Sequence, residues 1–277
     1  KIYALLFLLF SSCVSSTREK PGYTGPSGYD WNNPEKLKLS ISLDEISGIG
    51  YDPATRSIIA INDEEGKLYA IPLPDTKPLR KSKFSKGADY EDLCFDGTRW
   101  YALKSNGSLF AIDSPFTENV QSTKYKLPVK RKNEFEAVIF DKHKHQLVLI
   151  CKTCSGTNEI TGGYRFDLTS KTFDTIPSFS INFDGIPDSV VNKTKTVLVS
   201  GAAVHPLTGE WYILASANGL LLITDESGKC KAAYKLDRKQ FKQPEGICFT
   251  PDGGLYISNE ARNGAANILF FPYRKDG

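Results

Sequence analysis

Three glutamates recur at the same point of a repeated segment, and they are the side chains best placed to do chemistry. They are Glu91, Glu136 and Glu245, with Ser47 and Ser200 at the same point of two further segments. Two residues earlier, on the same face of an extended strand, stand Glu45, Asp89, Glu134, Leu198 and Gln243. If the segments meet around an axis, these carboxylates repel one another, and a bound cation would relieve the repulsion.

Calcium suits this residue set, because it takes six to eight oxygen ligands in a flexible geometry. Zinc or copper would require imidazole or thiolate ligands, and the three histidines, His143, His145 and His205, stand elsewhere in the repeat. We therefore predict a calcium ion held by Glu91, Glu136, Glu245 and Glu45. The alternative is that each glutamate accepts hydrogen bonds from backbone amides of the next segment, and the two roles are compatible.

The repeated segments are SGIGYDP, EDLCFDG, EAVIFDK, SGAAVHP and EGICFTP, and their starts are 44, 45, 64 and 45 residues apart. A period near 45 residues is typical of propeller blades. Each segment continues through a turn into two further apolar runs, and four of the five then close with a more polar run. This pattern predicts an all-β, five-bladed β-propeller of four-stranded blades, whose first strands line a central channel.

The last repeat lacks its fourth run before the chain ends. Residues Leu37–Leu43 alternate between apolar and polar side chains and precede the first repeat. We expect this N-terminal segment to pair into the last blade and close the ring, which removes the open sheet edges. The longer interval predicts an insertion near residues 178–197, between the third and fourth blades.

The N-terminus has the pattern of a secretory signal: Lys1, an apolar run, then small residues before Cys13. The run is too short to span a membrane as a helix, and Phe10–Cys13 resembles the bacterial lipoprotein cleavage box. The prediction is a lipoprotein-type signal peptide at 1–12, a lipidated Cys13, a flexible tether at 13–35 and the propeller domain at 36–277. The protein would be exported and lipid-anchored in the bacterial cell envelope, in the periplasm or on the outer membrane, with plain secretion as the alternative.

The net charge bears on the possible binding partners, and the cysteine pattern bears on possible metal and redox sites. A net charge of +3 from 35 basic and 32 acidic residues is no electrostatic reason to expect nucleic acid or an anionic membrane surface. We expect a monomer. Cys94 and Cys248 occupy matching positions with apolar neighbours, so we expect them to be core residues. Cys151 and Cys154 have the spacing of a redox pair or of half a zinc site, but no second CxxC or nearby histidine pair completes a metal site.

The segments LDEISGIGYDPATRSIIAINDE, ADYEDLCFDG, NEFEAVIFD and QPEGICFTPDGGLYISNE resemble the SdiA-regulated family of bacterial exported or membrane-attached proteins. The resemblance covers roughly residues 37–273. It implies a five-bladed propeller distantly similar to NHL-repeat proteins, a calcium site common to members and no established activity. Glu91, Glu136 and Glu245 match the family motifs, Ser258 and Glu260 resemble its Ser-x-Glu end, and Ser200 departs from the glutamate pattern.

Two functions from different classes fit the sequence. The first is a calcium-binding module or scaffold that holds an unknown ligand or protein at the channel mouth. The alternative is a calcium-dependent hydrolase of a lactone or phosphoester, in which the ion acts as a Lewis acid. No catalytic residue is assigned, because the serines and His205 form no Gly-x-Ser-x-Gly elbow. An open ligand position beside a base would separate the two.

Overall fold

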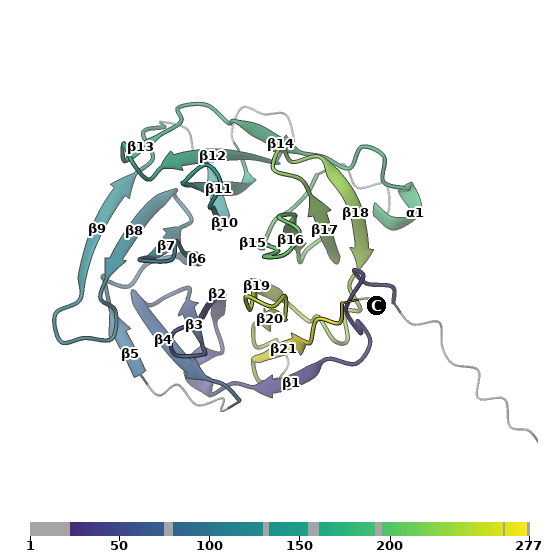
Figure 1. Ribbon diagram of the computed structural model, residues 1–277, viewed down its shortest axis with the longest axis horizontal. Coiled ribbons are helices and arrows are strands. Elements are labelled where there is room, and N and C mark those ends of the chain that lie inside the picture. Colours follow the sequence, from purple (N-terminus) through teal and green to yellow (C-terminus); the bar gives the residue numbers. More distant parts are fainter. Residues whose placement is uncertain are drawn as a thin grey trace, which may run out of the picture.

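Five antiparallel sheets surround a central channel as the blades of a propeller (Figure 1). The structure is a computed structural model that describes residues 23–74, 80–129, 133–154, 161–191, 196–262 and 264–275. The predicted all-β, five-bladed architecture is confirmed. The predicted signal peptide and Cys13 lie outside the described residues. Within the described part of the chain, no helix is long and apolar enough to cross a membrane.

Each blade runs from an inner strand at the channel to an outer strand at the rim. The first blade contains β2 (Ile46–Asp52), β3 (Ser57–Asn62), β4 (Lys67–Pro72) and β5 (Arg80–Lys83). The second contains β6 (Tyr90–Phe95), β7 (Trp100–Lys104), β8 (Ser108–Asp113) and β9 (Gln121–Lys126). The fourth contains β15 (Gly201–Val204), β16 (Trp211–Ala215), β17 (Leu220–Thr224) and β18 (Cys230–Lys235). The polar fourth strands lie at the rim, as their composition predicts.

The fifth blade joins the two ends of the described chain. It contains β19 (Pro244–Phe249), β20 (Leu255–Asn259), β21 (Asn267–Phe271) and β1 (Glu35–Lys38). β1 pairs antiparallel with β21, which is the predicted ring closure. The strand begins earlier and is shorter than Leu37–Leu43, because the chain then turns into the 3-10 helix η1 (Ile41–Leu43) and buries Leu43 completely.

The predicted tether does not extend to the residues just before β1. Trp31 is buried, and its indole stacks on Phe241 and Phe271 with ring centroids 5.0 and 4.8 Å away. The Tyr29 hydroxyl donates a hydrogen bond to the Gly253 carbonyl at 2.6 Å. Large aromatic rings gain stability from burial, which outweighs the Gly- and Ser-rich composition around them. The propeller therefore begins before residue 36.

The third blade differs from the others at its rim. It contains β10 (Glu134–Asp141), β11 (Gln146–Thr153), β12 (Thr161–Asp167), β13 (Thr172–Phe173) and β14 (Phe179–Ile181). β13 and β14 both pair with β12, and β14 comes from the predicted insertion. The short helix α1 (Asp188–Val191) follows and buries Val191. The insertion thus completes the third blade before the chain enters the fourth.

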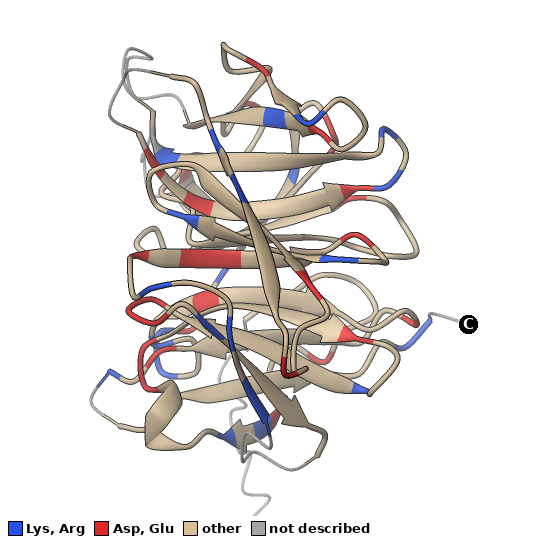
Figure 2. Ribbon diagram, turned by 90° about the vertical axis from the view of Figure 1, so that its left-hand side faces the viewer, with Lys and Arg blue, Asp and Glu red and all other residues tan. Residues whose placement is uncertain are grey.

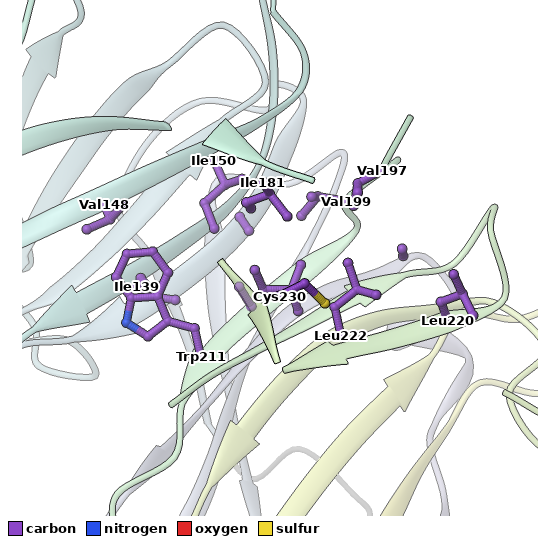
Figure 3. Packing of buried hydrophobic residues seen from close by; sticks show 14 of the residues in the cluster. Ile139, Val148, Ile150, Ile181, Val197, Val199, Trp211, Leu220, Leu222 and Cys230 are labelled. Carbon is purple, nitrogen blue, oxygen red and sulfur yellow. The ribbon is translucent and has the colours of Figure 1, made fainter. Parts of the chain in front are cut away.

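Apolar side chains fill the junctions between neighbouring blades. In the junction of the third and fourth blades, Ile139 and Ile150 lie near Trp211 and Leu222 (Figure 3). These side chains are at most 2% exposed. Burying such surface is the main favourable term of the fold. From the side, basic and acidic segments are interspersed over the blades (Figure 2).

Candidate functional site: the two ends of the central channel

The repeated glutamates stand at β-bulges. Along β6 and β7 the paired residues are Tyr90 with Lys104 and then Asp92 with Leu103, so the register skips Glu91. The inner strands of the third and fifth blades skip Glu136 and Glu245 in the same way. A bulge re-aims the residue that it leaves out of the ladder. In these three blades the bulge therefore turns one glutamate away from the strand ladder.

The structure brings these three glutamates together, as predicted. Burial first, and then repulsion from Glu136 and Asp89, raise the pKa of Glu91 to about 9. Burial, and then repulsion from Glu136 and Glu260, raise the pKa of Glu245 to about 8. Glu91 and Glu245 are therefore largely protonated at neutral pH, because close carboxylates cannot all ionise in a buried site.

A lysine that the sequence analysis overlooked supplies the positive charge. Lys152 of β11 places its Nζ 3.0 Å from Glu136 Oε1. Burial acts to lower the pKa of Lys152, yet Glu136, Glu245 and Glu91 together raise it. The ammonium group therefore does what a bound cation was predicted to do. Its place in the second strand of the third repeat is not enough to predict this contact, because the bulge that takes Lys152 out of the ladder is not visible in the repeat.

The fourth predicted ligand, Glu45, is linked to Glu245 through Glu260. Burial, and then a hydrogen bond with Glu45 and repulsion from Glu45 and Asp63, raise the pKa of Glu260 to about 7. Glu260 thus lies between Glu45 and Glu245, and Lys152 already pairs with Glu136. Among the described residues, no three acidic, histidine or cysteine side chains gather closely enough to hold a metal ion.

Other side chains make the polar links between inner strands. Asp92 accepts hydrogen bonds from the backbone amides of Val138, at 2.9 Å, and Leu93, at 2.8 Å. Ser200 Oγ donates to the Pro244 carbonyl at 2.8 Å. Ser258 Oγ, completely buried, donates to the Ser47 carbonyl at 3.2 Å. Asp92 therefore makes the kind of bond to a neighbouring blade's amide that was expected of the glutamates.

The opposite end of the channel is apolar. A cavity of about 420 Å³ is lined by residues from all five inner strands. The last apolar residue of each inner strand contributes to it: Tyr51, Phe95, Phe140, Val204 and Phe249. Ring contacts support this rim, since Phe95 stacks on Trp100 at 4.9 Å and Phe249 meets Tyr212 edge-on at 5.1 Å. These positions align the repeats in the sequence, but their convergence around a cavity was not predicted.

Two remaining predictions concern histidine and cysteine. The His205 Nδ1 accepts the amides of Leu207 and Thr208, while its Nε2 lies 3.0 Å from the Tyr29 hydroxyl. The His205 imidazole therefore stabilises the turn that contains Leu207 and Thr208. Cys151 and Cys154, for which we expected no redox role, form a disulfide. Cys248 is buried, as predicted for a core residue, whereas Cys94 is partly exposed.

Comparison with known proteins identifies a family and several similar structures. The profile of the SdiA-regulated family matches residues 25–263. No curated protein sequence matches the chain significantly. Glutaminyl cyclase from Myxococcus xanthus is 12% identical with a TM-score of 0.59, covering 87% of this chain and 96% of its own. PQQ-bound aldose sugar dehydrogenase from Streptomyces coelicolor is 10% identical with a TM-score of 0.56, covering 87% and 99%.

A third similar structure is a structural genomics protein of unknown function from Bacteroides thetaiotaomicron. It is 15% identical with a TM-score of 0.51, over 83% of this chain and 56% of its own. At such low identity these likenesses describe the fold alone, because propellers of the same architecture carry out unrelated functions.

Proposed function

Since this chain belongs to the SdiA-regulated family and its channel opens into an apolar cavity, we propose that it is a binding module for a small, largely apolar ligand. The observation that carries the proposal is the cavity formed where all five inner strands end.

Size and chemistry support a small-molecule site. A volume of about 420 Å³ falls within the range that ligand pockets usually have. Most of the lining is aliphatic or aromatic, and Asp96 and Thr250 add polar groups that could orient a ligand. Rings fixed by neighbouring rings lose little freedom when a ligand binds, which favours affinity.

The test fills the cavity with a side chain that the fold already accepts at equivalent positions. Four of the five rim positions are aromatic, and Val204 is the exception. N-phenyl-1-naphthylamine serves as an apolar fluorescent probe. Val204→Phe should weaken probe binding about tenfold, while Val204→Ala should keep it. Equal probe affinity in all three proteins, each with a native circular dichroism spectrum, would rule out binding in this cavity.

Calcium binding is a second proposal, and it requires Glu45, Asp63 and Glu260 to close around the ion, because these described side chains are not gathered closely enough to hold a metal as they stand. Asp63 Oδ1 is buried and has no hydrogen-bond partner among the described residues. Its acidic neighbours include Glu45 and Glu260, together with Glu64 and Asp89. Calcium should then raise the melting temperature of the wild type and have less effect on Glu45→Gln/Glu260→Gln. Glu91→Gln is the control that should respond like the wild type. Identical melting curves with calcium and with chelator would contradict the proposal.

The hydrolase alternative stays a prediction. It requires a base beside a bound ion with an open ligand position. A panel of lactones and phosphoesters, assayed with calcium and with chelator, tests it directly. Turnover that chelator abolishes and Glu45→Gln/Glu260→Gln removes would favour the enzyme over the binding module.

Envelope anchoring through Cys13 is likewise a proposal, carried by the residues around it in the sequence. We propose that the membrane contact is made through the lipid alone. Expression in a bacterium with radiolabelled palmitate should label the wild type and leave Cys13→Ser unlabelled. Label retained in Cys13→Ser would contradict a lipid at this cysteine.

A further inference from the structure

The third blade has a feature at the acidic end that its neighbours lack. Along β10 and β11 the register pairs Glu134 with Thr153, Phe135 with Cys151 and then Ala137 with Ile150. This register skips one residue on each strand, Glu136 on β10 and Lys152 on β11. Each bulge re-aims its residue, and the two skipped side chains form the 3.0 Å ion pair.

The second and fifth blades bulge only on the inner strand at this level. Their second strands have no residue left out of the ladder here. Leu103 and the next residue, Lys104, both pair with the inner strand of the second blade, and Ser258 and Asn259 do so in the fifth. Lys104 therefore stays paired opposite Tyr90, and its ammonium group lies over the Tyr90 ring, 5.8 Å from the centroid. A lysine at this height does not enter the carboxylate group without the additional bulge.

A disulfide closes around the bulge that carries Lys152. Cys151 and Cys154 are joined, with their Cα atoms 5.6 Å apart. Cys151 is completely buried in the core of the third blade, and Cys154 is 8% exposed. Such a short covalent loop restricts the backbone conformations open to the residues inside it. Lys152 is one of the two residues inside.

We propose that Lys152 is the resident cation of the acidic end of the channel, and that the Cys151–Cys154 disulfide is a reversible clamp that holds it on Glu136. The clamp makes the charge of this end sensitive to redox conditions. With the disulfide intact, the ammonium is fixed beside Glu136, Glu91 and Glu245. With the disulfide reduced, the loop regains conformational freedom and Lys152 can leave.

The reductant is a dithiol of the dithiothreitol class. One thiolate of the dithiol attacks the Sγ of Cys154, the more exposed of the two residues, and the Cys151 sulfur leaves and takes up a proton. The second thiol of the dithiol then displaces Cys154. The protein gains two electrons and two protons as two thiols, and the dithiol becomes a cyclic disulfide.

Amine acetylation followed by peptide mass spectrometry tests the clamp at single-residue level. The full chain is treated briefly with an N-hydroxysuccinimide acetate, oxidised and after dithiothreitol, and the rates at Lys152 and Lys104 are compared. Reduction should raise the Lys152 rate severalfold and leave the Lys104 rate unchanged. Mass spectrometry of alkylated thiols verifies that Cys151 and Cys154 were reduced.

Two variants complete the test. Glu136→Gln removes the ion-pair partner but keeps the disulfide, and it should give an intermediate Lys152 rate. Cys151→Ala/Cys154→Ala should reproduce the reduced rate without reductant. A Lys152 rate that is the same in oxidised and reduced protein would overturn the clamp. A Glu136→Gln rate equal to that of the oxidised wild type would overturn the assignment of Lys152 as the resident cation.

Discussion

The two ends of the channel are built from the same five strands, yet they differ in backbone and in chemistry. At the acidic end the ladder is broken by bulges that carry Glu91, Glu136 and Glu245. At the apolar end the ladder is regular, and the last apolar residues line the cavity. A repeat can therefore place charge at one end and apolar surface at the other by adding one residue to an inner strand, as the second, third and fifth blades do.

At the acidic end the charges are balanced, whereas the apolar end leaves an open volume. The acidic end compensates itself, because Lys152 pairs with Glu136 and the raised pKa values keep Glu91 and Glu245 protonated. The apolar end keeps a cavity of about 420 Å³ between side chains. We infer that the acidic end serves stability and redox response, and the apolar end serves binding.

Opening the ring should disturb both ends of the channel and cause the largest loss of stability. Deletion of residues 23–38 removes β1 and the stacked Trp31. Loss of the buried indole alone costs about 3–5 kcal/mol, and the freed edge of β21 adds to it. Thermal melting should show a sharply lower transition. Lys36→Ala/Lys38→Ala is the control, and unchanged melting of the deletion would disprove closure by β1.

Removing the ammonium should affect the acidic end alone. Lys152→Gln leaves Glu136 without its partner, and we expect a loss of about 1–2 kcal/mol, discounted because the lysine side chain is 36% exposed. Urea unfolding measures this loss. Lys104→Gln replaces a lysine that stays in the ladder, and it should lower the free energy of unfolding by less. Equal losses in the two variants would contradict a special role for Lys152.

The pH dependence of stability should also come from the acidic end. The pKa of Glu91 rises from 4.5 to about 9, and that of Glu245 from 4.5 to about 8. A raised carboxyl pKa gives stability that is present below pH 4.5 and lost as the pH rises through the folded-state value. Melting temperatures should therefore fall between about pH 5 and pH 9. Glu91→Gln should flatten this fall, and an unchanged slope in that variant would contradict the assignment.

The sequence predicts the fold well because the 45-residue period and the four runs per repeat are encoded locally. It also predicts that Glu91, Glu136 and Glu245 converge, since equivalent positions of a propeller meet at the axis. It does not predict Lys152, because a bulge present in one blade leaves no trace in a repeat alignment. Trp31 was missed because a single aromatic residue in a Gly-rich segment shows no periodicity.

The most direct test separates the two ends with one titration. Glu136→Gln/Lys152→Gln removes the ion pair without changing the net charge, while the cavity is untouched. The probe N-phenyl-1-naphthylamine is titrated into this double variant, into Val204→Phe and into the wild type, and its fluorescence is measured. We predict wild-type affinity in the double variant and about tenfold weaker binding in Val204→Phe. Weaker binding in the double variant with unchanged binding in Val204→Phe would contradict the division of roles between the two ends.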